Sequence, residues 1–496
     1  MVKGTENENN DSGYTFLSME DEAYLQYDVP KSSPHILVNQ LGYLKGKTKT
    51  AYFYAEELPK AFNVIDEKSG LVVYTGKLEE KGYNETYKAN IAVGNFTDFD
   101  DEGEYYIKAD YLGTSYKFGI GDGLYDDVFK EACKTYYYNR CGMTLTENFA
   151  GDYAHNACHT SYSVLRDDMT VNLDVTGGWH QDASGSKNVK EASKVLANIL
   201  LSYEIFPGAF SDDNGIPESR NDIPDILDEV KYEIEWLKKM QNESTGAVYS
   251  AVTVTEGTNK TLTSYVENAD IASTYAYAFS LAKFSFIYQT FDKPYATECL
   301  KSADRAWKYA SLNEDDNEEN ALWKLLAAAE LYRASGQKEF EDYLLKFWED
   351  GRFEDYINDE ITFYGCVTYL NTKQKTDREV CNGLIKAIMK KAEKISANAR
   401  KAPFATPADT DQTNNASLMD QMIVLTLVDY IITNHEYDNI IENYINYFMG
   451  RNPMSISYID DVGTYNYMEV HPSLGLMKQF DQNSKLIFMM SRIVEN

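Results

Sequence analysis

Positive charge, cysteine, histidine and proline are all scarce in this chain. Among its 496 residues, 47 are Lys or Arg and 78 are Asp or Glu, which gives a formal net charge of −31. A surface this acidic repels phosphate backbones and anionic lipid headgroups. We therefore expect no nucleic-acid partner and no role at a membrane surface, whereas neutral glycans are compatible with such a surface.

Long apolar runs are lacking as well. No stretch of about 18 apolar residues is present, so we expect no transmembrane helix and no membrane insertion. The opening MVKGTENENNDSGYTF has no apolar core and does not have the pattern of a signal peptide. Residues 1–30 are instead expected to form a disordered polar tail. The location stays open between the cytoplasm and secretion after removal of a signal.

Six cysteines are too few for a disulfide framework in a chain of this length, and their placement indicates metal ligation. Cys141, Cys158, His159 and His180 would supply two thiolates and two imidazoles, a complete tetrahedral zinc shell with no open position for water. The spacing is not that of a zinc finger. Two buried free thiols with two hydrogen-bonding histidines are the alternative, and His155 is an alternative ligand or part of a groove wall.

After residue 30 the chain changes to short alternating runs that are typical of β-strands. Turns with Gly, Asp or Lys-Gly bound seven of them: HILVNQLGY, TAYFYA, AFNVIDE, LVVYTG, YKANIAV, GEYYIKA and YKFGIG. They predict an antiparallel, immunoglobulin-like β-sandwich over residues 31–122.

From residue 123 to residue 496 the apolar spacing becomes helical. Runs such as EASKVLANILLSYEIF and STYAYAFSLAKFSFIYQTF predict amphipathic or buried helices. The segment has room for about twelve helices at roughly 30 residues per helix and loop. Twelve paired helices would form an (α/α)6 barrel, although an α-solenoid fits the same count. Asp222 and Asp225 are expected to cap the helix that contains Ile226 to Met240.

A series of motifs resembles glycoside hydrolase family 9, the cellulase-like inverting hydrolases. The motifs follow in order as LVNQLGY, YNRCG, AGDYAHNACHT, DVTGGWH, NGIPESRNDIPDILDEVKYEIEWLKKMQ, SADRAW and NYFMGRNPMSISY. The resemblance implies a mainly α fold, an (α/α)6 barrel preceded by a small immunoglobulin-like β-sandwich. It also implies a structural zinc, because several family members with that sandwich carry one at positions matching the Cys/His set.

The residues that would carry catalysis differ from the family pattern. An inverting glycosidase needs one carboxylate to activate water and one protonated carboxyl for the leaving oxygen. The family's Gly-Gly-Trp-His/Tyr-Asp-Ala-Gly-Asp loop is GGWHQDASGSKNV here, so Gln181 and Ser184 take the places of the two aspartates. With one gap, Asp182 takes the first place and Gly185 the second. Neither glutamine nor serine can accept a proton usefully at neutral pH.

The general acid also differs. Family members carry an Asn-Glu pair near the C-terminus, and this chain has Asn483-Ser484 there. Glu469 is a substitute acid if its loop folds inward, with a solvated glutamate as the alternative. His471 is all that remains of the family's substrate-contacting His-Arg motif. Whether the chain is an enzyme is left open, with Asp182 and Glu469 as candidate catalytic acids.

Aromatic residues make up 14% of the chain, with 40 Tyr, and tyrosine suits half-wet surfaces such as sugar-binding grooves. A tyrosine-favouring genome would give the same composition. The resemblance and the residue types suggest a set of substrate contacts: Tyr153, His155, Trp179, Phe404, Tyr458 and His471. Oxygen-bearing side chains at Ser211, Asp212, Asp213 and Asn214 allow a calcium site, with an exposed acidic turn as the alternative.

Three functions follow from these observations. The first is a family 9 scaffold that binds a β-linked oligo- or polysaccharide, with degenerate catalysis and a possible polysaccharide-processing protein partner. The second is an active inverting hydrolase with rearranged acids. The third is a structural or interaction module that uses the β-sandwich and the acidic surface.

Overall fold

The computed structural model describes residues 34–256, 262–314, 317–351, 353–407, 415–466 and 475–495. They fall mainly into two compact units, one of residues 130–388 and one of residues 34–129 with residues 389–494. The predicted tail over residues 1–30 lies outside the described residues. The domain boundaries proposed at residues 30 and 122 stay a prediction.

The second unit begins with a nine-stranded arrangement in the order β1-β3-β6-β5-β4-β7-β9-β2, with β8 paired to β7. Its strands are β1 (Ile36–Leu37), β2 (Gly42–Tyr43), β3 (Thr50–Ala55), β4 (Ala61–Asp66), β5 (Val72–Asn84), β6 (Ala89–Asn95), β7 (Gly103–Ala109), β8 (Gly113–Thr114) and β9 (Phe118–Ile120). All but the β2–β9 pair run antiparallel.

The long strand β5 joins the two halves of this sandwich. Its first half pairs with β4, up to Lys77, and its second half pairs with β6, from Leu78 onward. Side chains from both halves meet in one apolar core that includes Phe53, Phe62 and Ile107. The ring of Phe62 fits only because positions 76 and 94 are glycine, since a Cβ at either would lie within 2.7 Å of it. The predicted β-sandwich is therefore confirmed.

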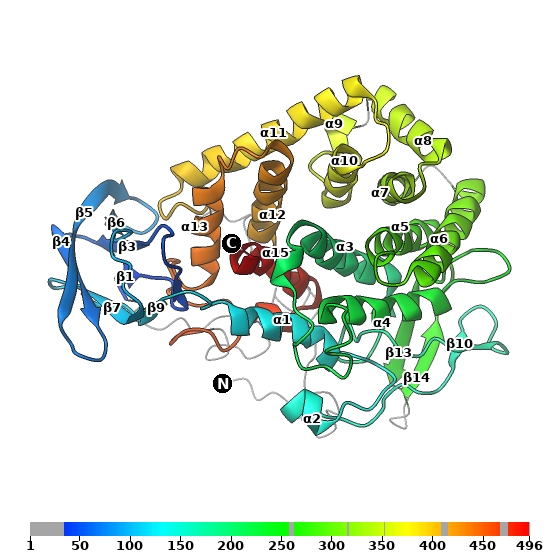
Figure 1. Ribbon diagram of the computed structural model, residues 1–496, viewed down its shortest axis with the longest axis horizontal. Helices are drawn as coiled ribbons and strands as arrows, with labels where there is room; N and C mark the ends of the chain where they lie inside the picture. Colours follow the sequence, from blue (N-terminus) through cyan, green and yellow to red (C-terminus); the bar gives the residue numbers. More distant parts are fainter. Residues whose placement is uncertain are drawn as a thin grey trace. The chain divides into compact units, whose positions relative to one another are not determined.

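The first unit is helical. Its helices are α1 (Asp126–Tyr138, which begins in the other unit), α2 (Glu147–Ala150), α3 (Val189–Ile205), α4 (Asp225–Lys239), α5 (Ile271–Tyr288), α6 (Lys293–Asn313), α7 (Glu318–Ser335), α8 (Lys338–Glu349), α9 (Phe353–Tyr356), α10 (Glu360–Asn371) and α11 (Arg378–Lys401, which ends in the other unit). The largely buried helices α3, α5, α7 and α10 pack in succession, and the amphipathic helices α6 and α8 pack against α5 and α7 (Figure 1). This alternation is the pattern of paired inner and outer helices.

Most of these helices begin at a capping side chain. Asn188 accepts hydrogen bonds from the backbone N–H groups of Lys190 and Glu191 at the start of α3, and Asp270 accepts one from Ser273 at the start of α5. Such caps satisfy N–H groups that have no partner inside the helix. A small sheet in the order β11-β10-β14-β13-β12 lies in the same unit, with strands β10 (Ser163–Leu165), β11 (Asn172–Leu173), β12 (Lys187–Asn188), β13 (Ala251–Glu256) and β14 (Leu262–Val266).

The second unit also contains α12 (Asn415–Ile432), α13 (Asp438–Phe448) and α15 (Phe480–Glu495). The motif LVNQLGY holds the sandwich to the segment that follows α13. Gln40 receives a hydrogen bond from the Tyr465 backbone and donates one to the Ser455 carbonyl. It also occupies the space beside Gly450 and Gly463, where an added Cβ would lie within 2.7 Å of its side chain.

Among the residues that the structure describes, one helix, α12, is apolar enough to cross a membrane by length and composition alone. Within the protein, 56% of it is buried, with residues such as Met419, Ile423 and Leu427 fully enclosed. This burial is that of a core helix. The expectation of no transmembrane helix stays a prediction.

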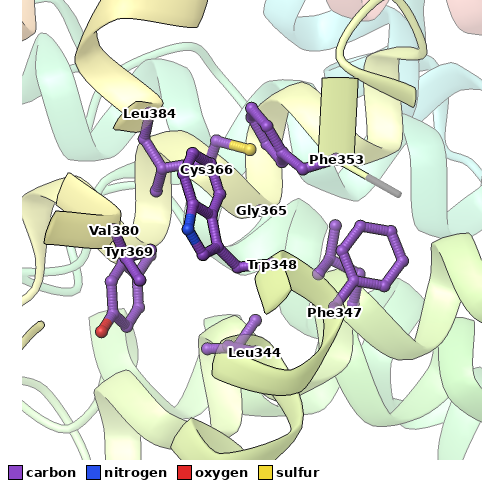
Figure 2. Close-up of a pocket in the computed structure, with 10 residues that line it drawn as sticks. Leu344, Phe347, Trp348, Phe353, Gly365, Cys366, Tyr369, Val380 and Leu384 are labelled. Atoms are coloured by element: carbon purple, nitrogen blue, oxygen red, sulfur yellow. The ribbon is translucent and has the colours of Figure 1, made fainter. Parts of the chain in front are cut away.

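A small apolar cavity lies among α7, α8, α10 and α11 (Figure 2). Its volume is about 20 Å³, and Leu344, Phe347, Trp348 and Leu384 are among its walls. A space of this size holds at most about one water-sized sphere, and walls of this kind offer a water almost no hydrogen bonds. The cavity is a packing defect. Substitution of two glycines on the neighbouring helices α10 and α11 tests how tightly its surroundings are packed.

We expect Gly365→Ala to stabilise the protein by about 0.5–1 kcal/mol, because alanine favours the helix over the unfolded chain. The added Cβ would meet Leu325 at 3.6 Å, an ordinary contact, on α10 beside the cavity. Gly383→Ala in α11 is the matched control, since its Cβ would lie 2.2 Å from the ring of Trp348. Overpacking of this kind costs about 1–3 kcal/mol. Urea unfolding should give opposite signs for the two variants, and the same sign for both would contradict the packing described.

Candidate functional site

Two segments far apart in sequence pair like strands at the centre of the candidate site. The backbone N–H of Cys141 donates to the carbonyl of Gly178 over 2.7 Å, and that of His180 donates to Asn139 over 2.8 Å. Arg140 and Trp179 form the bridge between these two bonds. The end of α1 is thereby fixed beside the Gly-Gly-Trp-His loop, and Cys141 is brought close to His180.

The predicted Cys/His set does come together. One ligand atom from each of Cys141, Cys158, His159 and His180 lies within 4.8 Å of all the others. The Cys158 Sγ and His180 Nε2 atoms are 3.3 Å apart. Around a tetrahedral zinc, ligand atoms are separated by about 3.3–3.8 Å, so a small contraction of the cluster would complete such a shell. The cluster can therefore hold a metal ion.

The donor atoms of His159 fit this use. Both ring nitrogens are buried and have no hydrogen-bond partner among the residues described. The ring packs against Gly185, where a Cβ would lie 2.4 Å from its Cε1 atom. Gly185 also has φ of +81°, so glycine is required there both for the turn and for the ring. His155, the alternative ligand, is outside the cluster and has its Nδ1 atom 2.7 Å from the Asn156 carbonyl.

A buried lysine lies next to the cluster. The Nζ atom of Lys187 is 4.0 Å from the Cys141 Sγ atom and donates to the carbonyls of Val175 and Gly177. Its hydrogen bonds tie the start of α3 to the loop before Trp179. Cys141 and Cys158 share a hydrogen bond between their thiol groups. This bond is the main cause that raises the pKa of Cys141, with burial as the second cause, and it lowers the pKa of Cys158.

The loop side chains that stand in place of the family's aspartates are bonded within the loop itself. The Asp182 Oδ1 atom accepts from the Ser184 N–H, the Ser184 hydroxyl and the Ser186 N–H over 2.7–3.0 Å. Gln181 accepts from the backbone N–H of Asn188 and donates to its carbonyl. The Ser184 hydroxyl also lies 2.7 Å from that of Ser186. These side chains stabilise the turn, and all three hydrogen bonds to the Asp182 side chain are made to its Oδ1 atom.

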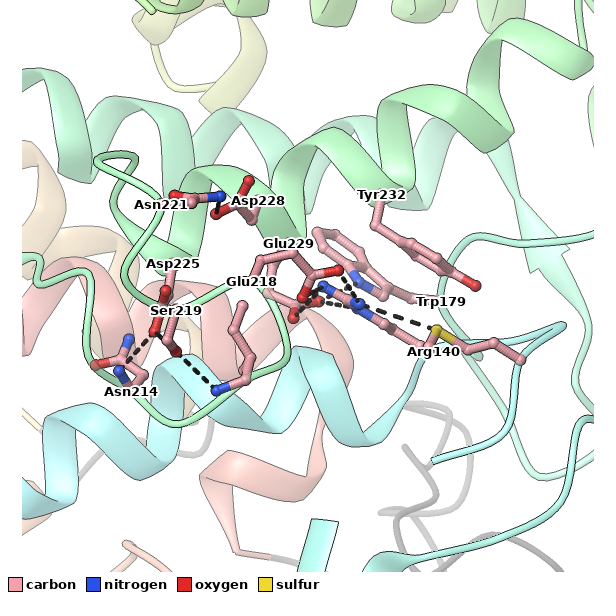
Figure 3. Close-up of polar contacts among 12 residues, drawn as sticks. Arg140, Trp179, Asn214, Glu218, Ser219, Asn221, Asp225, Asp228, Glu229 and Tyr232 are labelled. Atoms are coloured by element: carbon pink, nitrogen blue, oxygen red, sulfur yellow. Dashed lines mark hydrogen bonds and ion pairs between the residues drawn. The ribbon is translucent and has the colours of Figure 1, made fainter. Parts of the chain in front are cut away.

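Buried acids on α4 hold the tryptophan of the loop (Figure 3). Arg140, which is 1% exposed, forms ion pairs with Glu229 and Glu218 at 2.9 Å. The indole Nε1 of Trp179 donates to Glu229, and its backbone N–H donates to Glu233 over 2.7 Å. Burial raises the pKa of Glu229 to about 7 and that of Glu233 to about 8, against the lowering effect of Arg140 and of the Trp179 N–H, respectively. These acids thus position the loop that carries His180.

Reading the sequence missed this network and misassigned its neighbours. The helix begins at Asp225 with Pro224 as its N-cap and no side-chain cap, so the predicted capping by Asp222 and Asp225 is wrong. Asp225 accepts instead from the Asn214 N–H and the Ser219 hydroxyl (Figure 3). The available signal was the i, i+4, i+7 stripe of Glu229, Glu233 and Trp236, which lies on a face that is otherwise apolar.

The three suggested sugar contacts in this unit differ in exposure. Trp179 is fully buried, with its ring centroid 4.6 Å from that of Tyr136. His155 is 9% exposed. Tyr153 is half-buried against the ring of Tyr138. The burial of Trp179 indicates that it packs under the loop, whereas Tyr153 presents part of its ring to solvent.

In the other unit, Phe404 is 1% exposed and packs on Tyr52, Tyr54 and Tyr87. Tyr458 is 6% exposed and stacks on Tyr447. Ser484 is fully buried in α15, where its hydroxyl donates to the Asp481 carbonyl. Glu469 and His471 lie outside the described residues. The roles of all these residues in catalysis and substrate binding stay predictions.

The suggested calcium ligands bond to their own loop. Asp212 accepts from the backbone N–H groups of Arg220, Asn221 and Asp222. The Ser211 hydroxyl donates to the Asn214 side chain, and Asp213 pairs with Arg220. A calcium ion at this turn stays a prediction.

Solved structures show the class of protein to which this arrangement belongs. A metagenome-derived glycoside hydrolase family 9 endoglucanase matches 93% of this chain and 99% of its own, with a TM-score of 0.83 and 22% identity. A Zn-binding triple mutant of the family 9 endoglucanase J30 matches 91% and 99%, with a TM-score of 0.78 and 20% identity. The chain is thus a mainly α protein with an (α/α)6 barrel preceded by an immunoglobulin-like β-sandwich, as predicted.

Sequence comparison then gives the family. The family model for glycosyl hydrolase family 9 matches residues 125–485, and the model for the cellulase N-terminal Ig-like domain matches residues 31–114. The chain belongs to glycosyl hydrolase family 9. A cellodextrinase of Butyrivibrio fibrisolvens is 27% identical to it over 88% of this chain and 86% of that protein. The predicted family is therefore confirmed.

The buried acid Glu229, paired with Arg140, gives a pH-dependent stability. Because burial raises the Glu229 pKa from 4.5 to about 7, its contribution is fully present below about pH 4.5 and is lost as the pH rises through 7. The shift corresponds to at most about 3 kcal/mol. Urea unfolding between pH 5 and 8 should show a smaller loss in Glu229→Gln than in the wild type, because Glu233, whose pKa burial raises to about 8, still titrates in the variant.

Glu218→Gln is the matched variant on the same guanidinium. It leaves Arg140 to neutralise Glu229 alone, so the loss of stability should begin at lower pH than in the wild type. If the pH dependence of Glu229→Gln equals that of the wild type, Glu229 is not the group that titrates.

Proposed function

We propose that this chain is a glycan-binding member of glycosyl hydrolase family 9 whose own hydrolytic machinery is degenerate. The observation that carries the proposal is the bonding of Gln181, Asp182 and Ser184 within their loop. A general base must be free to take a proton from a water molecule near the substrate. Here neither Gln181 nor Ser184 can act as one, and Asp182 is tied into its own turn through its Oδ1 atom, which accepts three hydrogen bonds.

The ligand class follows from the relatives and the charge. The similar proteins include the cellodextrinase already described and Endoglucanase D of Acetivibrio thermocellus, which is 27% identical. A net charge of −31 favours a neutral glycan over an anionic one. We infer that the chain binds a β-linked glucan as an oligo- or polysaccharide. It would present that glycan to a polysaccharide-processing partner.

The alternative is an active inverting hydrolase that uses Asp182 and Glu469 in rearranged roles. Its support is the family itself, since the similar proteins are named as enzymes. A purely structural or interaction module is the third reading, and it predicts no glycan binding at all. Release of sugar and binding of sugar, measured together, separate the three.

We further propose that the Cys/His cluster binds a structural zinc ion. Cys141, Cys158, His159 and His180 would hold it, and four protein ligands leave no position for a reactive water. The ion would fix the segment of Cys158 and His159 to the paired segments of Cys141 and His180. The ring nitrogens of His159, which are buried and unpartnered among the residues described, support this use.

Incubation with β-glucans, xylans and chitosan should release no reducing ends, while isothermal titration should detect binding to a β-glucan oligosaccharide. Asp182→Asn should leave binding unchanged, because an asparagine Oδ1 atom can still accept the three hydrogen bonds of the loop. Asp168→Asn is the control, since Asp168 makes the same kind of turn with Thr170. Hydrolysis that Asp182→Asn abolishes and Asp168→Asn does not would establish the active hydrolase instead.

Elemental analysis should find about one zinc ion per chain in the wild type and almost none in Cys158→Ala. A metal ion that binds the folded state and not the unfolded state stabilises the folded protein. Cys158→Ala or chelation should therefore also lower the melting temperature. Cys133→Ala is the matched control, because Cys133 is a buried thiol outside the cluster and its loss should leave the zinc content unchanged. A zinc-free protein that melts at the same temperature would contradict the site.

A further inference from the structure

The second unit contains a large polar cleft. It has a volume of about 690 Å³ and is lined by residues of β3, β6, their flanking turns and α13. Clefts of about 300–1,000 Å³ are of the size that binds small molecules and short chains. None of the loop residues from 177 to 189 line it.

Four asparagines that line this cleft are bonded to the protein in the same way, through their amide oxygens. Each amide oxygen is already bonded: that of Asn95 to the Thr97 N–H, that of Asn439 to the Thr48 hydroxyl, that of Asn443 to the Arg451 guanidinium and that of Asn446 to the Asn39 amide. Their Nδ2 groups have no hydrogen-bond partner among the residues the structure describes. The cleft therefore carries a set of side-chain N–H donors that are left for a ligand.

Acceptors accompany these donors. Asp98 and Glu442 line the same cleft, and the Oε2 atom of Glu442 is buried without a hydrogen-bond partner in the described part of the chain. The hydroxyls of Thr48, Thr50 and Thr97 can both donate and accept. Donors and acceptors that lie side by side suit hydroxyl groups, because each hydroxyl of a ligand donates one hydrogen bond and accepts others.

The same lining argues against anionic ligands. The lining set contains two carboxylates and no lysine or arginine, so an anion would be repelled. Calcium binds to carboxylates as well as to amide oxygens, so calcium is the competing ligand at Asp98 and Glu442. The amide oxygens of the four asparagines are bonded to the protein and their N–H groups repel a cation, which favours a neutral, hydroxyl-rich ligand.

Arg451 holds side chains that line the cleft in fixed positions. It is 1% exposed, donates to the Thr50 hydroxyl and to the Asn443 amide, and lies with its guanidinium 5.1 Å from the centre of the Tyr52 ring. Two lining side chains are thereby held in place before a ligand arrives. Such preorganisation lowers the entropic cost of binding.

We propose that this cleft between the β-sandwich and α13 is a binding site for a short neutral oligosaccharide. The amide groups of Asn95, Asn439, Asn443 and Asn446 donate to sugar hydroxyls, and Glu442 accepts from them. The site does not depend on the proposed loss of hydrolysis, because none of its residues belongs to the loop between β11 and α3.

The test uses cellotriose on the full chain, with hydrogen exchange and calorimetry. Cellotriose should slow amide exchange in α13 and β6, and a double variant, Asn439→Ala with Glu442→Gln, should weaken that binding at least tenfold. Asn434→Ala with Glu436→Gln is the matched control, because both residues are exposed just before α13 and outside the cleft. Circular dichroism and the melting temperature establish that both variants are folded.

Three results would overturn the site. Unchanged exchange in α13 and β6 at saturating cellotriose is the first, and equal affinity of the double variant and the control is the second. The third is protection by calcium alone. Binding that protects residues 177–189 and is unaffected by the double variant would support the proposed function and refute this site. Protection of α13 and β6 that the double variant abolishes, without protection of residues 177–189, would support this site.

Discussion

The buried carboxylates of α4 are the constraint on which the candidate site depends. Two acids inside a protein are costly unless a cation and hydrogen-bond donors satisfy them. Arg140 and the two N–H groups of Trp179 do so here, which fixes the Gly-Gly-Trp-His backbone against the end of α1. Only with that backbone fixed do Cys141 and His180 come close enough to share a metal with Cys158 and His159. The arrangement of the Cys/His cluster thus depends on the acids, although no acid belongs to the cluster.

The loop next to this cluster illustrates the conflict between stability and catalysis. A catalytic carboxylate needs unsatisfied oxygens that face substrate and water, and such oxygens weaken the loop that carries them. In this chain Asp182 accepts three bonds, and Ser184 and Ser186 complete the turn. The loop is held by the positions that would otherwise perform the reaction. On the proposed function, a family 9 scaffold with this loop would keep a shaped backbone without the reactive groups.

The sequence predicted the larger features because they rest on repeated patterns. Alternating runs predicted the β-sandwich, helical spacing predicted the helices, and cysteine and histidine chemistry predicted that the four Cys/His side chains lie together. What it did not predict depends on partners that have no fixed spacing. Arg140 lies 89 residues from Glu229, and nothing local shows that they meet. Asp222 and Asp225 resembled caps by position, yet Asp225 bonds to Asn214 and Ser219. The sequence did not indicate that Trp179 is buried, because tryptophan occurs both in sugar-binding grooves and in protein cores.

The β-sandwich does more than support its neighbouring helices. To support the helices, the sandwich must be hydrogen-bonded to them or to the segment that follows α13. Asn39 and Gln40 provide these bonds, because their side chains bond to Asn446, Ser455 and Tyr465. A surface built for support alone would turn the remaining amides toward carbonyls. Instead the amide oxygens of the four asparagines accept hydrogen bonds from the protein, and their N–H groups remain for a ligand. Arg451 donates to the amide oxygen of Asn443 and so prevents that amide group from flipping. Water could satisfy these donors one at a time, but a rigid set that includes Glu442 is matched better by hydroxyls held on one ring. The sandwich is on this argument half of a glycan site as well as a brace.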